Sequence, residues 1–313
     1  MPPEILHTAT YRQSIRPGGS PLVNFLKNMG VLLEIGAKRR DWGAPFKRRL
    51  VRFLMADLAA MRIPPLEFYR YVSYYVGSTR HLETHFCYEN LWRLSQCKTY
   101  LDVSSPRVVP YFLLRSLRFE HATLCNPDVA DIELTQRSVA RGSKHTTFLP
   151  VRLQEIGRGK KFDLITSVSV VEHIAPDQTV EFMDHVREYL APGGLCLLTF
   201  PCAPSEILEY RDADPYTTQA YDDEHKDYYF QKYFTREMVE REILPGFREV
   251  LANRVFGERE KGQFRKYEAS SVINQNYSTF QDRQIVCDMF SEFRSIDDLP
   301  GIGVCCYLLK KAD

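Results

Sequence analysis

The stretch from Phe162 to Phe200 constrains the fold of this chain more than any other part of the sequence. It begins with a short apolar run, Phe162–Val168, which is typical of a buried strand. A helical stretch over Pro176–Leu190 follows, and a second apolar run occupies Leu195–Phe200. Between them, Pro192-Gly193-Gly194 stops the helix and turns the chain sharply, because glycine tolerates a positive φ. A strand, a crossover helix and a second strand indicate a parallel sheet.

The same alternation of apolar runs and helical stretches extends from about residue 97 to the C-terminus. Further strands are predicted at Thr99–Val103, Ala122–Cys125, Val250–Phe256 and Gly303–Leu309, and further helices at Pro110–Leu117 and Thr235–Leu244. Residues 203–233 and 258–300 are interpreted as insertions around the late strands. The pattern predicts an α/β domain over residues 97–313.

Residues 1–96 lack strand alternation and predict a separate N-terminal helical arm. The first 20 residues are rich in proline and glycine and lack periodicity, so we expect a loose arm there. Apolar residues at steps of three and four predict an amphipathic helix over Phe46–Met61, which Pro64-Pro65 stops. Helical stretches are also expected at Leu66–Tyr75 and Arg80–Leu94. This segment is suited to act as a lid or as a homodimer surface, and the sequence does not choose between them.

Composition narrows the class of partners. The chain has 41 Lys and Arg against 40 Asp and Glu, whereas nucleic-acid binders usually carry a clear basic excess. Because the charges balance, no nucleic-acid partner is expected. The chain has no apolar run of about 18 residues and no secretory signal, so no membrane partner is expected either. None of the eight cysteines forms a CxxC pair or lies at zinc-ligand spacing, so no metal is expected. We expect a soluble, cytoplasmic protein.

Two short motifs indicate a family. Val170-Val171-Glu172-His173-Ile174 follows the first apolar run, and the next helix ends in Leu190-Ala191-Pro192-Gly193-Gly194. In this order and spacing they closely resemble the fourth and fifth strands of class I, Rossmann-like, S-adenosylmethionine-dependent methyltransferases. The resemblance covers residues 97–313 and not the N-terminal helices. It implies a seven-stranded, mostly parallel sheet with an antiparallel last strand, and S-adenosyl-L-methionine as the cofactor.

The resemblance also implies cofactor-binding positions, although the family's glycine loop is altered. Asp102 matches the acid that ends the family's first strand, but Ser104-Ser105-Pro106-Arg107-Val108 replaces the glycines. Asn126 stands where an acid usually binds the ribose, and Asp128 lies two residues further on. The implied cofactor-binding residues are Asp102, Ser104, Ser105, Asn126, Asp128, Ser167, Glu172, Tyr75 and Arg80. Arg80 is the candidate for pairing with the cofactor's carboxylate.

Candidate catalytic residues, which would act on the methyl acceptor, follow the fourth and fifth strands. Methyl transfer needs a base only when the acceptor must lose a proton. His173 lies at the turn after the fourth strand and is the first catalytic candidate, although it could simply cap that turn. Tyr229 is the second, in a segment dense in acids and tyrosines where family members build the acceptor pocket. Asp222, Asp223, Glu224 and His225 in that segment are interpreted as a solvated loop, not a metal site.

Three functions remain open at this point. The first is methylation of a small-molecule metabolite, such as a natural product or a sugar-like acceptor. The second keeps the cofactor but uses it for cyclisation, elimination or aminocarboxypropyl transfer, which altered loops would suit. The third is a catalytically inactive binding module. Because Asp102, Glu172 and His173 persist beside polar substitutes, the first function is favoured.

Overall fold

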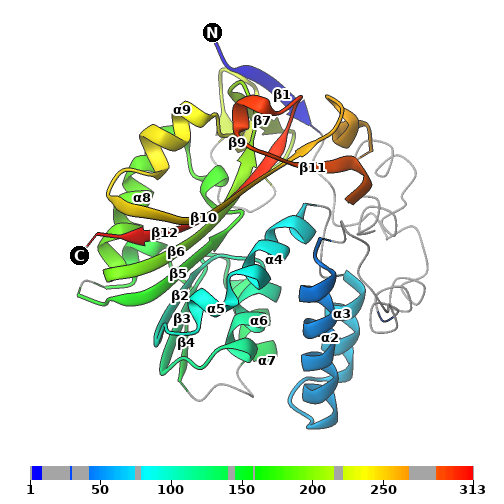
Figure 1. Cartoon of the computed structure of the whole chain (residues 1–313), viewed down its shortest axis with the longest axis vertical. Helices are drawn as coiled ribbons and strands as arrows, with labels where there is room; N and C mark the ends of the chain where they lie inside the picture. Colours follow the sequence, from blue (N-terminus) through cyan, green and yellow to red (C-terminus); the bar gives the residue numbers. More distant parts are fainter. Residues whose placement is uncertain are drawn as a thin grey trace.

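A computed structural model describes residues 2–8, 29, 42–74, 79–139, 145–157, 159–214, 221–267 and 287–312. Its centre is an eight-stranded sheet in the order β11-β10-β12-β6-β5-β2-β3-β4 (Figure 1). The strands are β2 (Thr99–Val103), β3 (His121–Cys125), β4 (Thr146–Leu149), β5 (Phe162–Val168), β6 (Leu190–Cys202), β10 (Phe247–Glu258), β11 (Phe290–Phe293) and β12 (Gly303–Lys311). Strands β4, β3, β2, β5 and β6 are parallel, and β12 is antiparallel to β6.

This sheet confirms the predicted fold class and all six predicted strands, and β5 begins and ends at the predicted residues. Two strands were missed. β4 has four residues, none of them fully buried, so it carries no continuous apolar signal. β11 pairs with the outer edge of β10 and makes the sheet eight-stranded where seven strands were predicted. A short edge strand is a common addition to a sheet of this kind.

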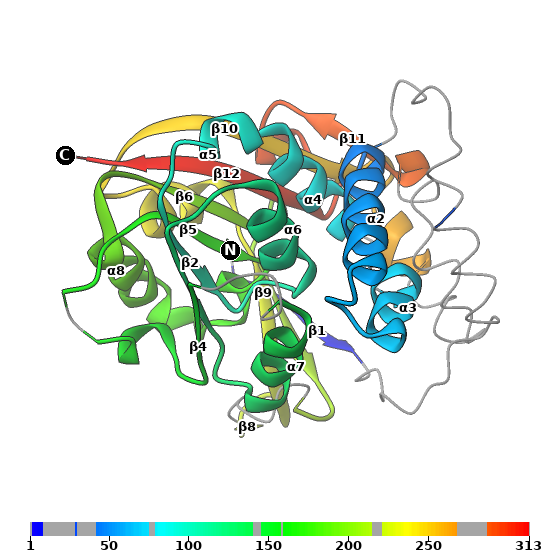
Figure 2. The same ribbon diagram turned by 90° about the horizontal axis from the view of Figure 1, so that it is seen from below.

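Helices cover both faces of the sheet. On one face, α4 (Arg80–Glu89), α5 (Leu91–Leu94), α6 (Val108–Ser116) and α7 (Val129–Val139) share an apolar core with alternate strand residues. On the other face, the core lies under α8 (Thr179–Tyr189). Two further helices, α2 (Ala44–Ala59) and α3 (Pro65–Tyr74), lie outside α4 and α6 (Figure 2).

The N-terminal helices share the core of the sheet. The rings of Phe46 in α2 and Phe112 in α6 lie 4.1 Å apart between centroids. Asp57 of α2, which is 4% exposed, accepts a 2.7 Å hydrogen bond from the Tyr111 hydroxyl and pairs with Arg115 at 3.1 Å. Apolar packing and a buried polar anchor therefore fasten the outer helices to the sheet.

The Pro-Gly-Gly turn has a different form from the predicted one. Helix α8 ends at Tyr189, before Pro192, and Leu190 already pairs with Phe162 of β5. The next pair is Leu164 with Leu195, so Ala191–Gly194 form a bulge in β6. Gly193 has φ of 66°, the left-handed conformation that the sequence predicted for this turn.

A second sheet corrects one prediction and gives structure to a predicted insertion. Strands β1 (Glu4–Thr8), β7 (Ile207–Arg211), β8 (Tyr221–Asp222) and β9 (Asp227–Tyr233) form it in the order β1-β7-β9-β8. The prediction of a loose arm is wrong for residues 4–8, because β1 pairs in parallel with β7 along its whole length. The predicted insertion at 203–233 contributes three strands. Five residues paired with a segment about two hundred positions away leave no local signal in the sequence.

The small sheet lies against the carboxyl ends of β5 and β6. Phe234, just after β9, donates its N–H to the carbonyl of Pro201 in β6 at 3.0 Å. The chain then enters α9 (Arg236–Met238) and a π-helical turn over Val239–Ile243, where a helix was predicted. Thr235 caps this helix by accepting a 3.2 Å hydrogen bond from the Met238 N–H. None of the described helices is both long and apolar enough to span a membrane.

Candidate active site at the carboxyl ends of the strands

The strand order itself marks a position for a site. The chain passes outward from β2 to β3 and β4, then returns to the other side of β2 for β5 and β6. Ligands bind open α/β sheets at the carboxyl ends of strands where the order reverses in this way. The switch point is therefore between β2 and β5, where the loops starting at Ser104 and Ser169 meet.

The loop after β2 takes the form of a glycine loop without glycines. Ser104 has φ of 50°, a left-handed conformation that only glycine adopts without strain. Its N–H donates to the carbonyl of Cys125 at 2.9 Å. Ser105 accepts a 3.1 Å hydrogen bond from the Val168 N–H through its Oγ, which ties the loop to β5. The loop is thus held by hydrogen bonds to both neighbouring strands.

Asp102 of β2 holds this loop through a hydrogen bond from the Ser105 N–H. It is 3% exposed, and its carboxylate accepts hydrogen bonds from Thr166 Oγ1 at 2.7 Å, Tyr100 Oη at 3.1 Å and the Ser105 N–H at 3.2 Å. Burial raises the pKa of Asp102 to about 6, although these hydrogen bonds oppose the rise. The contacts give Asp102 a role in shaping the loop, and its direct contact with a cofactor stays a prediction.

Asn126 and Asp128 lie at the end of the next strand and face solvent in part. Asn126 Oδ1 accepts from the Asp128 N–H at 2.9 Å, and its Nδ2 donates to Asp131 at 3.0 Å. Asp131 also pairs with Arg107 of the loop after β2 at 3.1 Å. The Asn126 amide nevertheless carries a second N–H, and Asp128 is exposed, so both side chains can still bind hydroxyl groups.

The turn after β5 buries an acid. Ser169 has φ of 51°, and Glu172, three residues on, is 2% exposed. Burial raises the pKa of Glu172 to about 8, and the nearby Glu83 carboxylate adds to the rise. Among the described residues, Glu172 Oε2 has no hydrogen-bond partner. Glu172 is therefore protonated at neutral pH, and one of its oxygens is buried without a donor among the described residues.

His173, next to Glu172, is held as a neutral imidazole. Its Nδ1 lies 2.7 Å from the carbonyl oxygen of Phe230 in β9, so Nδ1 carries the hydrogen and donates it. Burial lowers the pKa of His173 to about 4, and the positive charges of Arg80 and Arg211 lower it further. The second nitrogen, Nε2, lies 3.8 Å from Glu172 Oε1 and is unprotonated.

Three predicted site residues do not join this group as expected. The Tyr229 hydroxyl donates to the carbonyls of Glu172 at 2.7 Å and Ile174 at 3.3 Å, and burial raises its pKa well above the usual value. Tyr229 thus braces the turn, and its catalytic role stays a prediction. Ser167 is fully buried within β5. Tyr75 lies outside the described residues.

Glu83 belongs to this region, although it is not among the predicted cofactor-binding residues. It is 1% exposed and lies in α4, one turn after Arg80, which is 29% exposed. Arg80 Nη1 donates to Glu83 Oε2 at 3.1 Å, while Glu83 Oε1 accepts from the hydroxyls of Ser169 and Thr199. An Arg and a Glu three residues apart usually mark a pair on the surface of a helix, so the burial of Glu83 could not be predicted from this spacing.

A second cluster that was missed comes from the small sheet. Glu209 of β7 is 5% exposed and accepts hydrogen bonds from Thr8 at 2.7 Å, Gln231 at 2.7 Å and Tyr233 at 3.2 Å. Arg211 pairs with Glu209 at 3.3 Å, and its guanidinium carbon lies 3.2 Å from the centroid of the Phe230 ring. The same Phe230 supplies the carbonyl that holds His173, so the cluster adjoins the turn after β5.

The site geometry agrees with a sequence comparison. A protein-family model described as a methyltransferase domain matches residues 9–242 of the 313 in this chain. The chain belongs to the methyltransferase-domain family. The match starts at residue 9, so the prediction that the resemblance excludes the N-terminal helices is wrong. The predicted division of the chain at residues 96 and 97 stays a prediction.

Solved structures that resemble this methyltransferase-family chain are distant from it in sequence. The N-methyltransferase NodS from Bradyrhizobium japonicum WM9, in complex with S-adenosyl-L-homocysteine, is 12% identical, covers 85% of this chain and 100% of its own, and has a TM-score of 0.43. Coclaurine N-methyltransferase, bound to N-methylheliamine and SAH, is 11% identical, covers 94% and 100%, and has a TM-score of 0.49. No curated protein is significantly similar in sequence. At these values the neighbours say nothing about the substrate of this chain.

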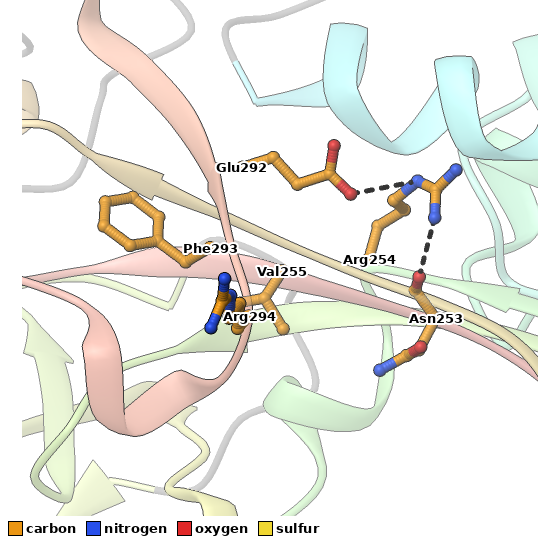
Figure 3. A pocket seen from close by; sticks show the side chains of 6 residues that line it. All are labelled: Asn253, Arg254, Val255, Glu292, Phe293 and Arg294. Carbon is orange, nitrogen blue, oxygen red and sulfur yellow. Dashed lines mark hydrogen bonds and ion pairs between the residues drawn. The ribbon is translucent and has the colours of Figure 1, made fainter.

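A pocket on the outer edge of the sheet belongs to a different part of this methyltransferase fold. It is lined by Asn253, Arg254, Val255, Glu292, Phe293 and Arg294, in β10, β11 and the residue that follows (Figure 3). Arg254 pairs there with Glu292 at 3.2 Å and with Glu89 of α4 at 3.6 Å. None of the predicted site residues lines this pocket, so it does not compete with the switch point as the candidate active site.

Proposed function

We propose that this chain is an S-adenosyl-L-methionine-dependent methyltransferase that acts on a small-molecule acceptor. One observation carries the proposal: a neutral histidine, an uncharged buried acid and an Arg–Glu pair meet where the strand order reverses. His173 and Glu172 follow β5, and Arg80 and Glu83 come from α4. This combination supplies a proton acceptor and a cation at the edge of the sheet where α/β enzymes bind their ligands.

The residues present fit the amino-acid end and the ribose of the cofactor. Arg80 offers a cation for the carboxylate, and Glu172 Oε2 is a buried oxygen that lacks a donor among the described residues. Asn126 and Asp128 would take the ribose hydroxyls, and the Ser104–Arg107 loop would meet the amino-acid portion. When bound, the cofactor supplies an electrophilic methyl group on a sulfonium.

His173 is the residue that would accept a proton from the acceptor. The hydrogen bond from Nδ1 to the Phe230 carbonyl fixes the ring and leaves Nε2 as the basic atom. Arg80 and Arg211 disfavour the protonated ring, so the proton would leave again readily. Glu172 is protonated and adds no charge beside the base. These features suit an amine or hydroxyl acceptor that loses its proton as the methyl group arrives.

The small sheet supports a small acceptor. Its strands cover the carboxyl ends of β5 and β6, and the Glu209 cluster lies next to His173 through Phe230. Closely spaced polar side chains on a rigid sheet suit a natural product or a sugar-like molecule. The eight cysteines are all free and buried, which supports a cytoplasmic location.

One observation favours a second candidate, a cofactor-free binding module. The side chains of Asp102, Ser105 and Asn126 already make internal hydrogen bonds, so they do not need a ligand to be satisfied. Product analysis separates the candidates. The chain is incubated with methyl-labelled cofactor and a panel of small amines, phenols and sugars, and the products are identified by mass spectrometry. The proposal expects S-adenosylhomocysteine and a labelled acceptor. Methylthioadenosine would indicate attack at another sulfonium carbon, and unchanged cofactor would favour the binding module.

The role of His173 gives a direct prediction. His173→Asn keeps an N–H donor for the Phe230 carbonyl but removes the basic Nε2. We expect kcat to fall by roughly 10²-fold or more, while cofactor affinity changes little. Steady-state kinetics and calorimetry measure the two effects separately. An unchanged kcat would show that His173 only holds the turn.

A further inference from the structure

Glu83 joins three separate parts of the fold at one carboxylate. The residue itself belongs to α4, and its Oε1 accepts from Thr199 Oγ1 of β6 at 3.1 Å and from the Ser169 hydroxyl after β5. Its Oε2 accepts from Arg80 Nη1 at 3.1 Å. The Glu83 side chain is 1% exposed, so the carboxylate itself is shielded from water, and the contact with Thr199 is fully buried.

The partner of Glu83 is less buried than Glu83 itself. Arg80 is 29% exposed, and its positive charge lowers the pKa of both His173 and Glu172. Glu83, which accepts from Arg80, also accepts from the Ser169 hydroxyl after β5, so the guanidinium is linked to the switch point through one carboxylate. A guanidinium presents its five N–H donors in a fixed planar fork, so one short contact largely sets the direction of the others. The Glu83 carboxylate therefore restricts the directions in which the Arg80 guanidinium can point.

A role in fastening α4 to the sheet does not account for both oxygens of the Glu83 carboxylate. A carboxylate that only fastened α4 to the sheet could do so through the Ser169 and Thr199 hydroxyls alone, which both bind Oε1. The second oxygen is instead turned toward Arg80, on the same side of the helix as the switch point. Glu83 Oε1 accepts from the two hydroxyls at the strand ends, and Oε2 accepts from the Arg80 guanidinium.

We propose that Glu83 is a positioning residue, which holds the Arg80 guanidinium in place for the carboxylate of the bound cofactor. The inference rests on the proposed function, because it assumes that S-adenosyl-L-methionine binds at the switch point. Glu83 does not touch the ligand. It acts through Arg80, and the strand-end hydroxyls of Ser169 and Thr199 act through Glu83.

Two ligands that differ in the carboxylate test this role without any turnover. S-adenosylhomocysteine carries the amino-acid carboxylate, whereas 5′-methylthioadenosine lacks it and shares the nucleoside. Calorimetry measures both affinities for the wild-type chain and for Glu83→Gln, which keeps the size of the side chain. We expect Glu83→Gln to weaken S-adenosylhomocysteine roughly tenfold and to leave 5′-methylthioadenosine unchanged. The control is Glu89→Gln in the same helix, whose partners are His85 and Arg254, and it should change neither affinity.

Each other outcome has a defined meaning. Equal loss for both ligands, or no loss for either, would overturn the positioning role while leaving the cofactor site intact. If the wild-type chain binds neither ligand, the proposed function fails and the inference fails with it. Should Glu83→Gln not fold, Thr199→Val removes one anchor of Oε1 at constant shape. It should weaken S-adenosylhomocysteine alone, and an equal effect on both ligands would contradict the proposal.

Discussion

Two acids at the centre of the candidate site are buried so deeply that they hold their protons to unusually high pH. Burial raises the pKa of Asp102 to about 6 and that of Glu172 to about 8. The two differ in their surroundings, because Asp102 has hydrogen-bond donors on both oxygens, whereas Glu172 Oε2 has none among the described residues. Asp102 is therefore suited to hold a loop, and Glu172 to meet a ligand.

The raised pKa of Glu172 makes the stability of the chain depend on pH. The folded state binds a proton that the unfolded state releases above the usual pKa of 4.5, so the free energy of unfolding falls as pH rises from about 4.5 to 8. Glu172→Gln cannot ionise and lacks this loss. Between pH 5 and pH 8, we expect the wild type to lose roughly 2–4 kcal/mol more than the variant. Urea unfolding at the two pH values measures the difference, and parallel losses would contradict the assignment.

At the scale of elements, the bulge between α8 and the body of β6 shows what the sequence could and could not predict. Pro192-Gly193-Gly194 correctly predicted a sharp turn and a positive φ, because these depend on the residues themselves. It did not predict that β6 already begins at Leu190, because that start is set by the pairing of Leu190 with Phe162 across the sheet. The backbone conformation of the turn could be predicted from its own residues, whereas the pairing of residues distant in sequence could not.

The left-handed residue in this bulge should be sensitive to a side chain. Gly193→Val places a β-branched residue at φ of 66° and should lower the free energy of unfolding by about 1–3 kcal/mol. Pro192→Val, at the exposed neighbour in the same bulge, should have a much smaller effect. Denaturant melts of the two variants make the comparison. Equal midpoints would mean that the bulge does not need the glycine.

A buried carboxylate at the end of β10 binds backbone N–H groups of the following loops. Glu258, at the end of β10, is 1% exposed and accepts the N–H groups of Gly262 at 2.7 Å, Ile302 at 3.0 Å and Phe264 at 3.0 Å. Glu258→Gln turns an NH₂ group toward a backbone N–H, and we expect a loss of about 1–3 kcal/mol in unfolding free energy. The exposed Glu260→Gln is the matched control. A melt of Glu258→Gln that matches the control would show that these contacts add nothing.

Distant parts of the chain converge at the candidate site. The sheet supplies the switch point, α4 brings Arg80 and Glu83 to it, and β9 holds His173 through the carbonyl of Phe230 (Figure 1). The order of apolar runs predicted the sheet and placed Asp102, Glu172 and His173 at strand ends. The burial of Glu83, the pairing of β1 with β7 and the contact from Phe230 were not predictable, because each depends on tertiary neighbours far away in sequence.

Under the proposed function, this switch point binds an adenosyl sulfonium although serines stand where the family has glycines. Titration calorimetry with S-adenosyl-L-methionine tests it most directly, with Asp102→Ala as the variant that disturbs the loop after β2. We predict one site per chain with a dissociation constant below about 0.1 mM, and a large loss of affinity in a variant that is still folded. No heat of binding at about 1 mM cofactor, or equal affinity in Asp102→Ala, would contradict the claim.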